Sequence, residues 1–65
     1  MKILDCHEIG SMTVLFLDEE LPVTDWRSLR VDGVRYEARM VMDAGKNVIA
    51  VDGAHDLTGK TVEFV

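Results

Sequence analysis

The residue types most able to do chemistry in this chain are few. They are one cysteine, Cys6, two histidines, His7 and His55, and the acid Asp56 beside the second histidine. Structural zinc needs cysteines or histidines at spacings such as Cys-x-x-Cys or His-x-x-x-His, and the sequence has neither. Adjacent residues on a strand, as Cys6 and His7 are expected to be, also point to opposite faces. The sequence therefore predicts no metal site.

Nucleophilic catalysis is the second chemistry to consider, because Cys6, His55 and Asp56 are the residue types of a nucleophile, a base and an orienting acid. No nucleophile elbow accompanies them. A domain of this size also has little room for a substrate pocket of roughly 300 Å³ or more. The segment 58–61 looks like the end of a phosphate-binding loop, but Ala54 replaces the first glycine of that motif. We therefore expect no enzyme, no catalytic residue and no cofactor.

A basic segment is the feature best suited to binding. All four arginines lie within residues 27–39, where two acids leave a net charge of +2, against −7 for the rest of a chain whose total is −5. Alternation places Arg30, Arg35 and Arg39 on one face of a predicted hairpin. Extending the register of that hairpin puts Trp26 opposite Arg39. An indole among guanidinium groups can stack on a base, a peptide or an acidic partner. The alternative interpretation is a solvated face, with the indole packed over one end of the domain.

Self-association is the second way in which this segment could bind. By alternation Val41 shares the outer face with Arg39, and Met40–Met42 is apolar on both faces. A small core gains from a partner, and methionine suits adaptable interfaces. A homodimer through the strand predicted over residues 34–42 is therefore a candidate. The expected interaction surface comprises Trp26, Arg30, Arg35, Arg39 and Val41.

Two binding functions remain open. The first is an interaction or accessory module that binds a protein partner or a second copy of itself. The alternative is a nucleic-acid-binding barrel that uses the Trp26, Arg30, Arg35 and Arg39 face. The net charge of −5 disfavours nucleic acid without deciding the question, and it disfavours an anionic membrane surface in the same way.

Length and composition indicate a single small domain over residues 1–65. Hydrophobic residues make up 48% and charged residues 29%, which is typical of a globular protein. No apolar run is longer than four residues, as in Val14–Leu17, which is far shorter than the roughly 20 residues of a membrane span. A single cysteine cannot form an internal disulfide, so we expect a cytoplasmic protein.

The elements that would position these residues are short strands. Alternation of apolar and polar residues predicts strands over residues 2–9, 12–17, 29–31, 34–42, 47–51 and 60–65. Gly10-Ser11 makes a hairpin of the first two, and Asp43–Lys46 closes another. The stretch 18–28 is expected to be irregular, because Pro22 argues against a central strand. Thr24-Asp25 caps at most one helical turn through Arg27.

The clearest local signal is Asp32-Gly33 between two strands. A two-residue primed turn needs positive φ at both positions, which Asp tolerates and Gly adopts without strain. The predicted register pairs Val31 with Val34, Arg30 with Arg35, Leu29 with Tyr36 and Ser28 with Glu37. The apolar face then carries Leu29, Val31, Val34, Tyr36, Ala38, Met40 and Met42. The polar face carries Arg30, Arg35, Glu37 and Arg39.

These elements predict an all-β fold, either a compact sandwich or, as we expect, a small five- or six-stranded antiparallel barrel with at most short helical turns. Leu57 is expected to plug one end, residues 56–59 to form a tight helical turn, and Val62 and Phe64 to face inward. The layout is similar to SH3-like barrels in that a short turn, His55–Thr58, precedes the last strand. The resemblance is one of architecture. The clustered aromatics with which SH3 domains grip Pro-rich peptides have no counterpart among the four aromatics of this chain.

Overall fold

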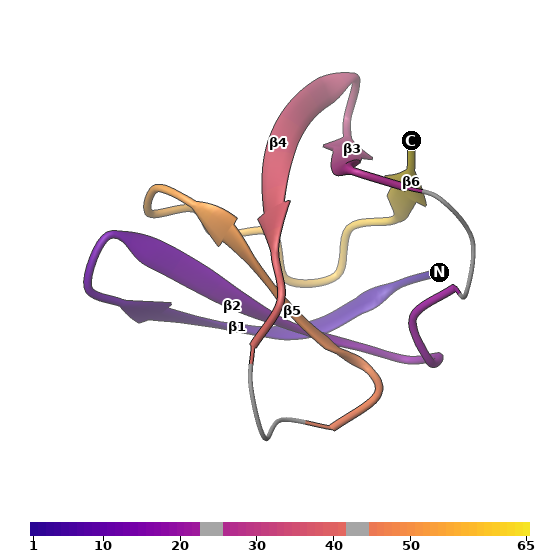
Figure 1. Ribbon diagram of the computed structural model, residues 1–65, viewed down its shortest axis with the longest axis horizontal. Coiled ribbons are helices and arrows are strands. Elements are labelled where there is room, and N and C mark those ends of the chain that lie inside the picture. The colour runs from indigo at the N-terminus through magenta and orange to yellow at the C-terminus, as the bar shows by residue number, and fades with distance from the viewer. Residues whose placement is uncertain (23–25, 42–44) are drawn as a thin grey trace.

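The computed structural model describes residues 1–22, 26–41 and 45–65. Its strands are β1 (Ile3–Ile9), β2 (Met12–Leu17), β3 (Ser28–Val31), β4 (Val34–Arg39), β5 (Val48–Asp52) and β6 (Val62–Phe64). They form one six-stranded antiparallel sheet in the order β1-β2-β5-β4-β3-β6 (Figure 1). The described residues contain no helix, so the predicted all-β class is confirmed. None of their segments is a helix that could cross a membrane.

Two tight turns fix the faces of the sheet. Ile9 pairs with Met12 across Gly10-Ser11, which makes β1 and β2 the predicted hairpin. Between β3 and β4, Asp32 has φ of 52° and Gly33 has φ of 78°, as a two-residue primed turn requires. The register of that hairpin is the predicted one, from Val31–Val34 to Ser28–Glu37. The Asp-Gly turn and all four cross-strand pairs are thus confirmed.

Several element boundaries differ from the prediction. β4 ends at Arg39 rather than at residue 42, and Ser28 belongs to β3 rather than to the irregular stretch before it. Residues 56–59 do not form a helical turn. Instead, a β-turn is closed by the Lys60 N–H, which donates to the Leu57 carbonyl at 3.1 Å, with Gly59 at a φ of 83°. The predicted cap at residues 24–25, and Met42 and Asp43, lie outside the described residues.

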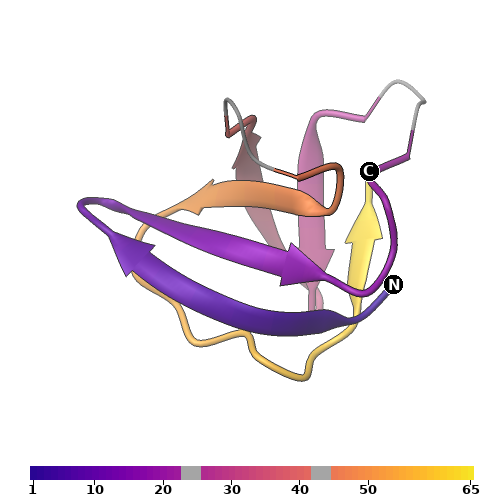
Figure 2. The same ribbon diagram turned by 90° about the horizontal axis from the view of Figure 1, so that it is seen from below.

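The main core lies on the inner face of the sheet. The strands β1, β2 and β5 run across the strands β3 and β6, so the sheet folds over its own inner side chains (Figure 2). The inner cluster, as we name these buried side chains, comprises Ile3, Leu15, Leu17, Leu29, Val31, Ile49, Val51, Leu57 and Val62. Half-buried Phe64 packs against it, so the predicted inward placement of Leu57, Val62 and Phe64 is confirmed.

Two side chains assigned to the apolar face of the hairpin are exposed instead. Val34 is 51% exposed and Met40 is 68% exposed. Val34 directly follows the turn, at the tip of the hairpin. Met40 follows the last residue of β4, beyond the final cross-strand pair between Arg39 and Ala50. Period-two alternation predicts a face but not what covers it, and this is why the two side chains were assigned to the core.

The sheet does not close through a continuous ladder, so the predicted barrel is not confirmed. β1 and β6 occupy the two ends of the strand order. The first and last parts of the chain are joined by an isolated bridge between Lys2 and Thr61 rather than by a ladder of strand pairs. Around that bridge, the Ile3 N–H donates to the Lys60 carbonyl at 2.9 Å, and the Val62 N–H donates to the Met1 carbonyl at 2.8 Å.

Candidate interaction surface

The arginines of the hairpin lie on its outer face, where two of them, Arg30 and Arg39, meet carboxylates. Arg30, Arg35 and Arg39 are all exposed, and Arg30 lies directly opposite Arg35. Arg30 Nη2 lies 2.9 Å from a carboxylate oxygen of Glu63, its cross-strand neighbour on β6. Arg39 is paired with Asp52. Among the described residues, Arg35 is the member of this set without an ion pair. Most of the positive charge on this face is therefore balanced locally.

The pair between Arg39 and Asp52 is bidentate. The Arg39 Nε donates to Asp52 Oδ1 at 2.5 Å, and Nη2 donates to Oδ2 at 3.3 Å. The hydrogen bond from Arg39 lowers the pKa of Asp52, and the reciprocal bond raises the pKa of Arg39. Because both side chains are exposed, salt screens the attraction between them. The pair orients the guanidinium without burying it.

Trp26 does not lie opposite Arg39 among the arginines, and that expectation was wrong. The register between β3 and β4 ends at the pair of Ser28 and Glu37. The Trp26 ring instead packs against the inner cluster and meets Phe64 edge-on, with the ring centroids 4.9 Å apart. Its Nε1–H donates to the Pro22 carbonyl at 2.9 Å. The indole thus packs against the core, in line with the alternative interpretation considered from the sequence.

Val41 belongs to a second apolar cluster on the outer face. Val14, Val48 and Ala50 are buried there, on the side of the sheet opposite the inner cluster. Met12, Phe16 and Val41 are half-buried and pack against these three side chains. We call these six residues the outer patch. Arg39 pairs with Ala50, so the guanidinium borders the outer patch on the same face, as alternation predicted for Arg39 and Val41.

The opposite border of the outer patch is also polar. The His7 ring meets Phe16 edge-on at a centroid distance of 5.4 Å. His7 Nε2 lies 3.0 Å from one carboxylate oxygen of Asp5, and the other oxygen accepts the Cys6 N–H at 2.9 Å. The outer patch thus lies between two exposed polar pairs, one of Asp5 and His7 and one of Arg39 and Asp52.

The residues considered for metal binding or catalysis are distributed over both faces of the sheet. Cys6 packs against the inner cluster, whereas His7 lies on the outer face, as alternation predicted. His55 stacks edge-on against Tyr36 at 4.7 Å, and its Nε2 lies 2.9 Å from the Asp52 carbonyl oxygen. Because a carbonyl only accepts, that nitrogen carries the proton. No three potential metal ligands gather within the described ranges.

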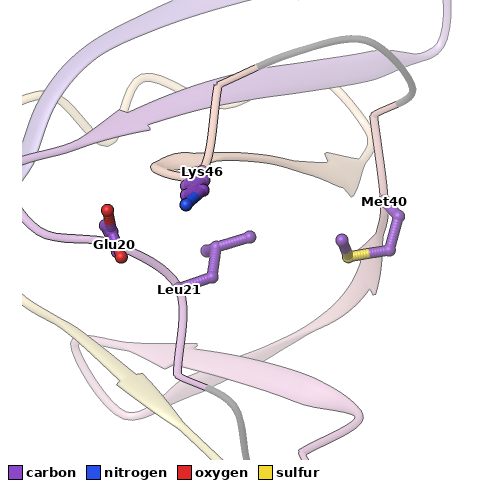
Figure 3. Close-up of a pocket in the computed structure, with 4 residues that line it drawn as sticks. All are labelled: Glu20, Leu21, Met40 and Lys46. Atoms are coloured by element: carbon purple, nitrogen blue, oxygen red, sulfur yellow. The ribbon is translucent and has the colours of Figure 1, made fainter.

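A pocket of about 340 Å³ lies beside the end of β4, although the small size of the domain argued against a pocket of that volume. Among the described residues, Glu20, Leu21, Met40 and Lys46 line it. Leu21 and Met40 extend into the space from opposite sides (Figure 3). The walls therefore come from three separate segments of the chain.

Sequence reasoning missed the outer patch, although β2 held a signal for it. The continuous apolar run Val14–Leu17 implies a second apolar face on this strand, but only Val41 of that face was named as a candidate. β5 carries the same signal, with a continuous apolar run over Val48–Val51. No protein-family model, no curated protein and no solved structure matches this chain.

Proposed function

We propose that this chain is a non-catalytic protein-interaction module that contacts a protein partner through the outer patch. The observation that carries this proposal is an apolar cluster on the face of the sheet that the core does not use. Its members Met12, Phe16 and Val41 remain partly accessible. Two polar pairs flank them, and an apolar centre with a polar rim is the usual anatomy of a protein interface.

The local charge balance favours a protein partner over nucleic acid. Nucleic-acid affinity comes chiefly from cations that neutralise phosphates. On this face, Glu63 and Asp52 already pair with Arg30 and Arg39. The remaining arginine, Arg35, provides too little uncompensated charge for a phosphate-binding surface in a chain of net charge −5. Within the proposed function, Arg39 orients the partner at the border of the outer patch and Arg35 extends the contact along β4.

The partner is either a different protein or a second copy of this chain. A domain of 65 residues has a small core, so covering half-buried side chains by association stabilises it appreciably. We also propose that the sheet acts as a partly closed barrel. The bridge between Lys2 and Thr61 and the hydrogen bonds beside it support that view. A cytoplasmic location is part of this proposal, in line with the single cysteine.

Affinity purification with matched variants tests the proposal. A tagged chain is expressed in the cells that naturally produce it, as the wild type, as Val41→Ser and as Val34→Ser. Val34 is an exposed aliphatic residue at the hairpin tip, away from the outer patch, and is the matched control. We expect at least one protein to be retained by the wild type and by Val34→Ser and lost with Val41→Ser. Sedimentation velocity over a hundredfold concentration range detects a second copy as that partner.

Two results count against the proposal. If Val41→Ser keeps every protein that the wild type retains, and neither chain self-associates, the outer patch is a folding feature only. If RNA or DNA binds with a steep salt dependence that Arg35→Glu removes, the nucleic-acid alternative replaces the proposed function. In such binding, the logarithm of the binding constant falls with the logarithm of the salt concentration with a slope of roughly one unit per phosphate contacted.

A further inference from the structure

We propose that the pocket lined by Leu21, Met40, Glu20 and Lys46 is a docking site for one aliphatic side chain of a basic protein segment. The pocket is separate from the outer patch, because Met40 lines it whereas the next residue, Val41, packs into the outer patch. The inference therefore adds a second contact site to the proposed function and names the chemistry that this site recognises.

Two apolar side chains of the described residues line the pocket, and they have different roles. Leu21 is half-buried and packs against the inner cluster, so it is held by the fold. Met40 is 68% exposed. The thioether of methionine adapts to the shape of whatever covers it. An aliphatic side chain placed between Leu21 and Met40 would remove both from water.

Two of the segments that line the pocket are tied together by hydrogen bonds of the backbone and of one side chain. The Leu21 N–H donates to the Lys46 carbonyl at 2.8 Å, which joins the segment of Leu21 to that of Lys46. The Leu17 N–H donates to the Asn47 carbonyl at 2.9 Å, and Asn47 Nδ2 donates to the Leu17 carbonyl at the same distance. A site held in this way loses little conformational freedom when it is filled.

The size and openness of the pocket indicate a side chain rather than a whole small molecule. A volume of about 340 Å³ is at the lower end of small-molecule sites, which span roughly 300–1,000 Å³. Such sites also bury most of the ligand surface. Here Met40 is largely exposed, so the pocket is open to solvent on its side. An open apolar pocket of this kind suits an anchor residue of a peptide segment whose remainder stays outside.

Charge selects the segment that would carry the anchor. Asp18, Glu19 and Glu20 are consecutive and exposed on the loop that leads into the pocket. The Asp18 carboxylate already accepts the Lys2 backbone N–H at 2.9 Å. Among the described lining residues Glu20 and Lys46 balance each other, and Asp18 and Glu19 beside the pocket add two negative charges. A segment with Lys or Arg beside its aliphatic residue complements this charge, whereas an acidic segment is repelled.

The test follows the methionine methyl groups by NMR while synthetic peptides are added to the whole chain. The probe peptide has one leucine flanked by lysines. One comparison peptide replaces the leucine by glycine, and another replaces the lysines by glutamates. We expect the lysine-flanked peptide to move the Met40 methyl signal and to leave those of Met1, at the inner cluster, and Met12, in the outer patch, in place. Both comparison peptides should bind at least about tenfold more weakly.

Variants distinguish this inference from the proposed function. Met40→Gln should weaken binding of the probe peptide about tenfold, because a buried methionine contact is lost. Val34→Thr, at another exposed aliphatic residue, and Val41→Ser, in the outer patch, should leave peptide binding unchanged. The inference is overturned if no peptide moves the Met40 signal at millimolar concentration. It is equally overturned if the glutamate or glycine peptide binds as well as the probe. Either result would leave the proposed function of the outer patch to be tested separately, by affinity purification with Val41→Ser.

Discussion

The inner cluster and the outer patch are both built from apolar side chains of β2 and β5, yet they differ in how completely they are covered. Leu15 and Ile49 of the inner cluster are fully buried, because the sheet folds over them. Val14 and Val48, from the same two strands, are covered mainly by half-buried neighbours. Half-buried side chains border both clusters, but among the described residues the inner cluster has nine buried members and the outer patch has three. This difference separates a part that stabilises the chain from a part that is available for binding.

The largest expected effect is on the inner cluster. Leu15→Ala removes a fully buried side chain and leaves a cavity that the surrounding strands fill only in part. We expect it to lower the free energy of unfolding by about 2–5 kcal/mol, much or all of the stability of a domain this small. Urea denaturation monitored by circular dichroism measures the change. A loss below about 1 kcal/mol would mean that the inner cluster does not hold the fold.

Trp26→Ala should have the next largest effect, because the indole packs against the inner cluster and not beside the arginines. Losing this half-buried ring and its hydrogen bond to Pro22 should cost about 2–3 kcal/mol. The variant should keep the partner of the outer patch under conditions in which it is folded. If the variant is folded but no longer binds the partner, Trp26 belongs to the binding surface, which would contradict its assignment to the core.

A pair of identical substitutions compares the two clusters most evenly. Val51→Ala lies in the inner cluster and Val41→Ala in the outer patch. The first should cost about 2 kcal/mol, because two methyl groups are lost from a fully buried site. The second should cost less than about 1 kcal/mol, because Val41 is only half-buried. Chemical denaturation of both variants gives the comparison. Equal losses would show that the outer patch is as much a part of the core as the inner cluster.

The smallest effect concerns the Asp52–Arg39 pair at the border of the outer patch. The pKa of Asp52 is lowered in the folded chain, so the charged carboxylate stabilises the fold above the ordinary pKa of aspartate. That contribution is lost as the pH falls through the lowered pKa. Asp52→Asn should therefore melt slightly lower than the wild type near pH 6, and the difference should vanish in acid, once the pH lies below the lowered pKa of Asp52. If the difference in melting temperature persists in acid, it has a cause other than the ion pair.

Much of the fold was predictable because its signals are local. Asp32-Gly33 favours a two-residue primed turn. That turn determines the register of β3 and β4, and hence every cross-strand pair between them. The ion pair of Arg30 with Glu63 was not predictable, because it depends on the pairing of β3 with β6, more than thirty residues apart. Trp26 was misplaced for a related reason. The backbone N–H groups before and at the start of β3 bond to the Val65 carbonyl, so the hairpin register stops before it reaches Trp26.

The candidate sites were less predictable than the fold. Alternation put Arg39 and Val41 on one face correctly, but the apolar residues that surround Val41 come from β2 and β5, and their pairing with each other is not encoded by any short turn. The pocket beside Met40 combines three segments that only the tertiary structure brings together. Sites of this kind depend on long-range contacts, to which period-two patterns are insensitive.

The most direct test of the division between the two clusters follows the methyl group of Met12 while the partner retained by the wild type is added. Met12 lies in the outer patch, whereas Met1 packs against the inner cluster, so the two methyl groups report on the two clusters separately. If the partner proves to be a second copy, the same spectra are recorded against protein concentration. We predict that the Met12 signal shifts or broadens as binding saturates and that the Met1 signal stays in place. A Met12 signal that is unchanged at saturation would contradict the assignment of the outer patch as the binding surface.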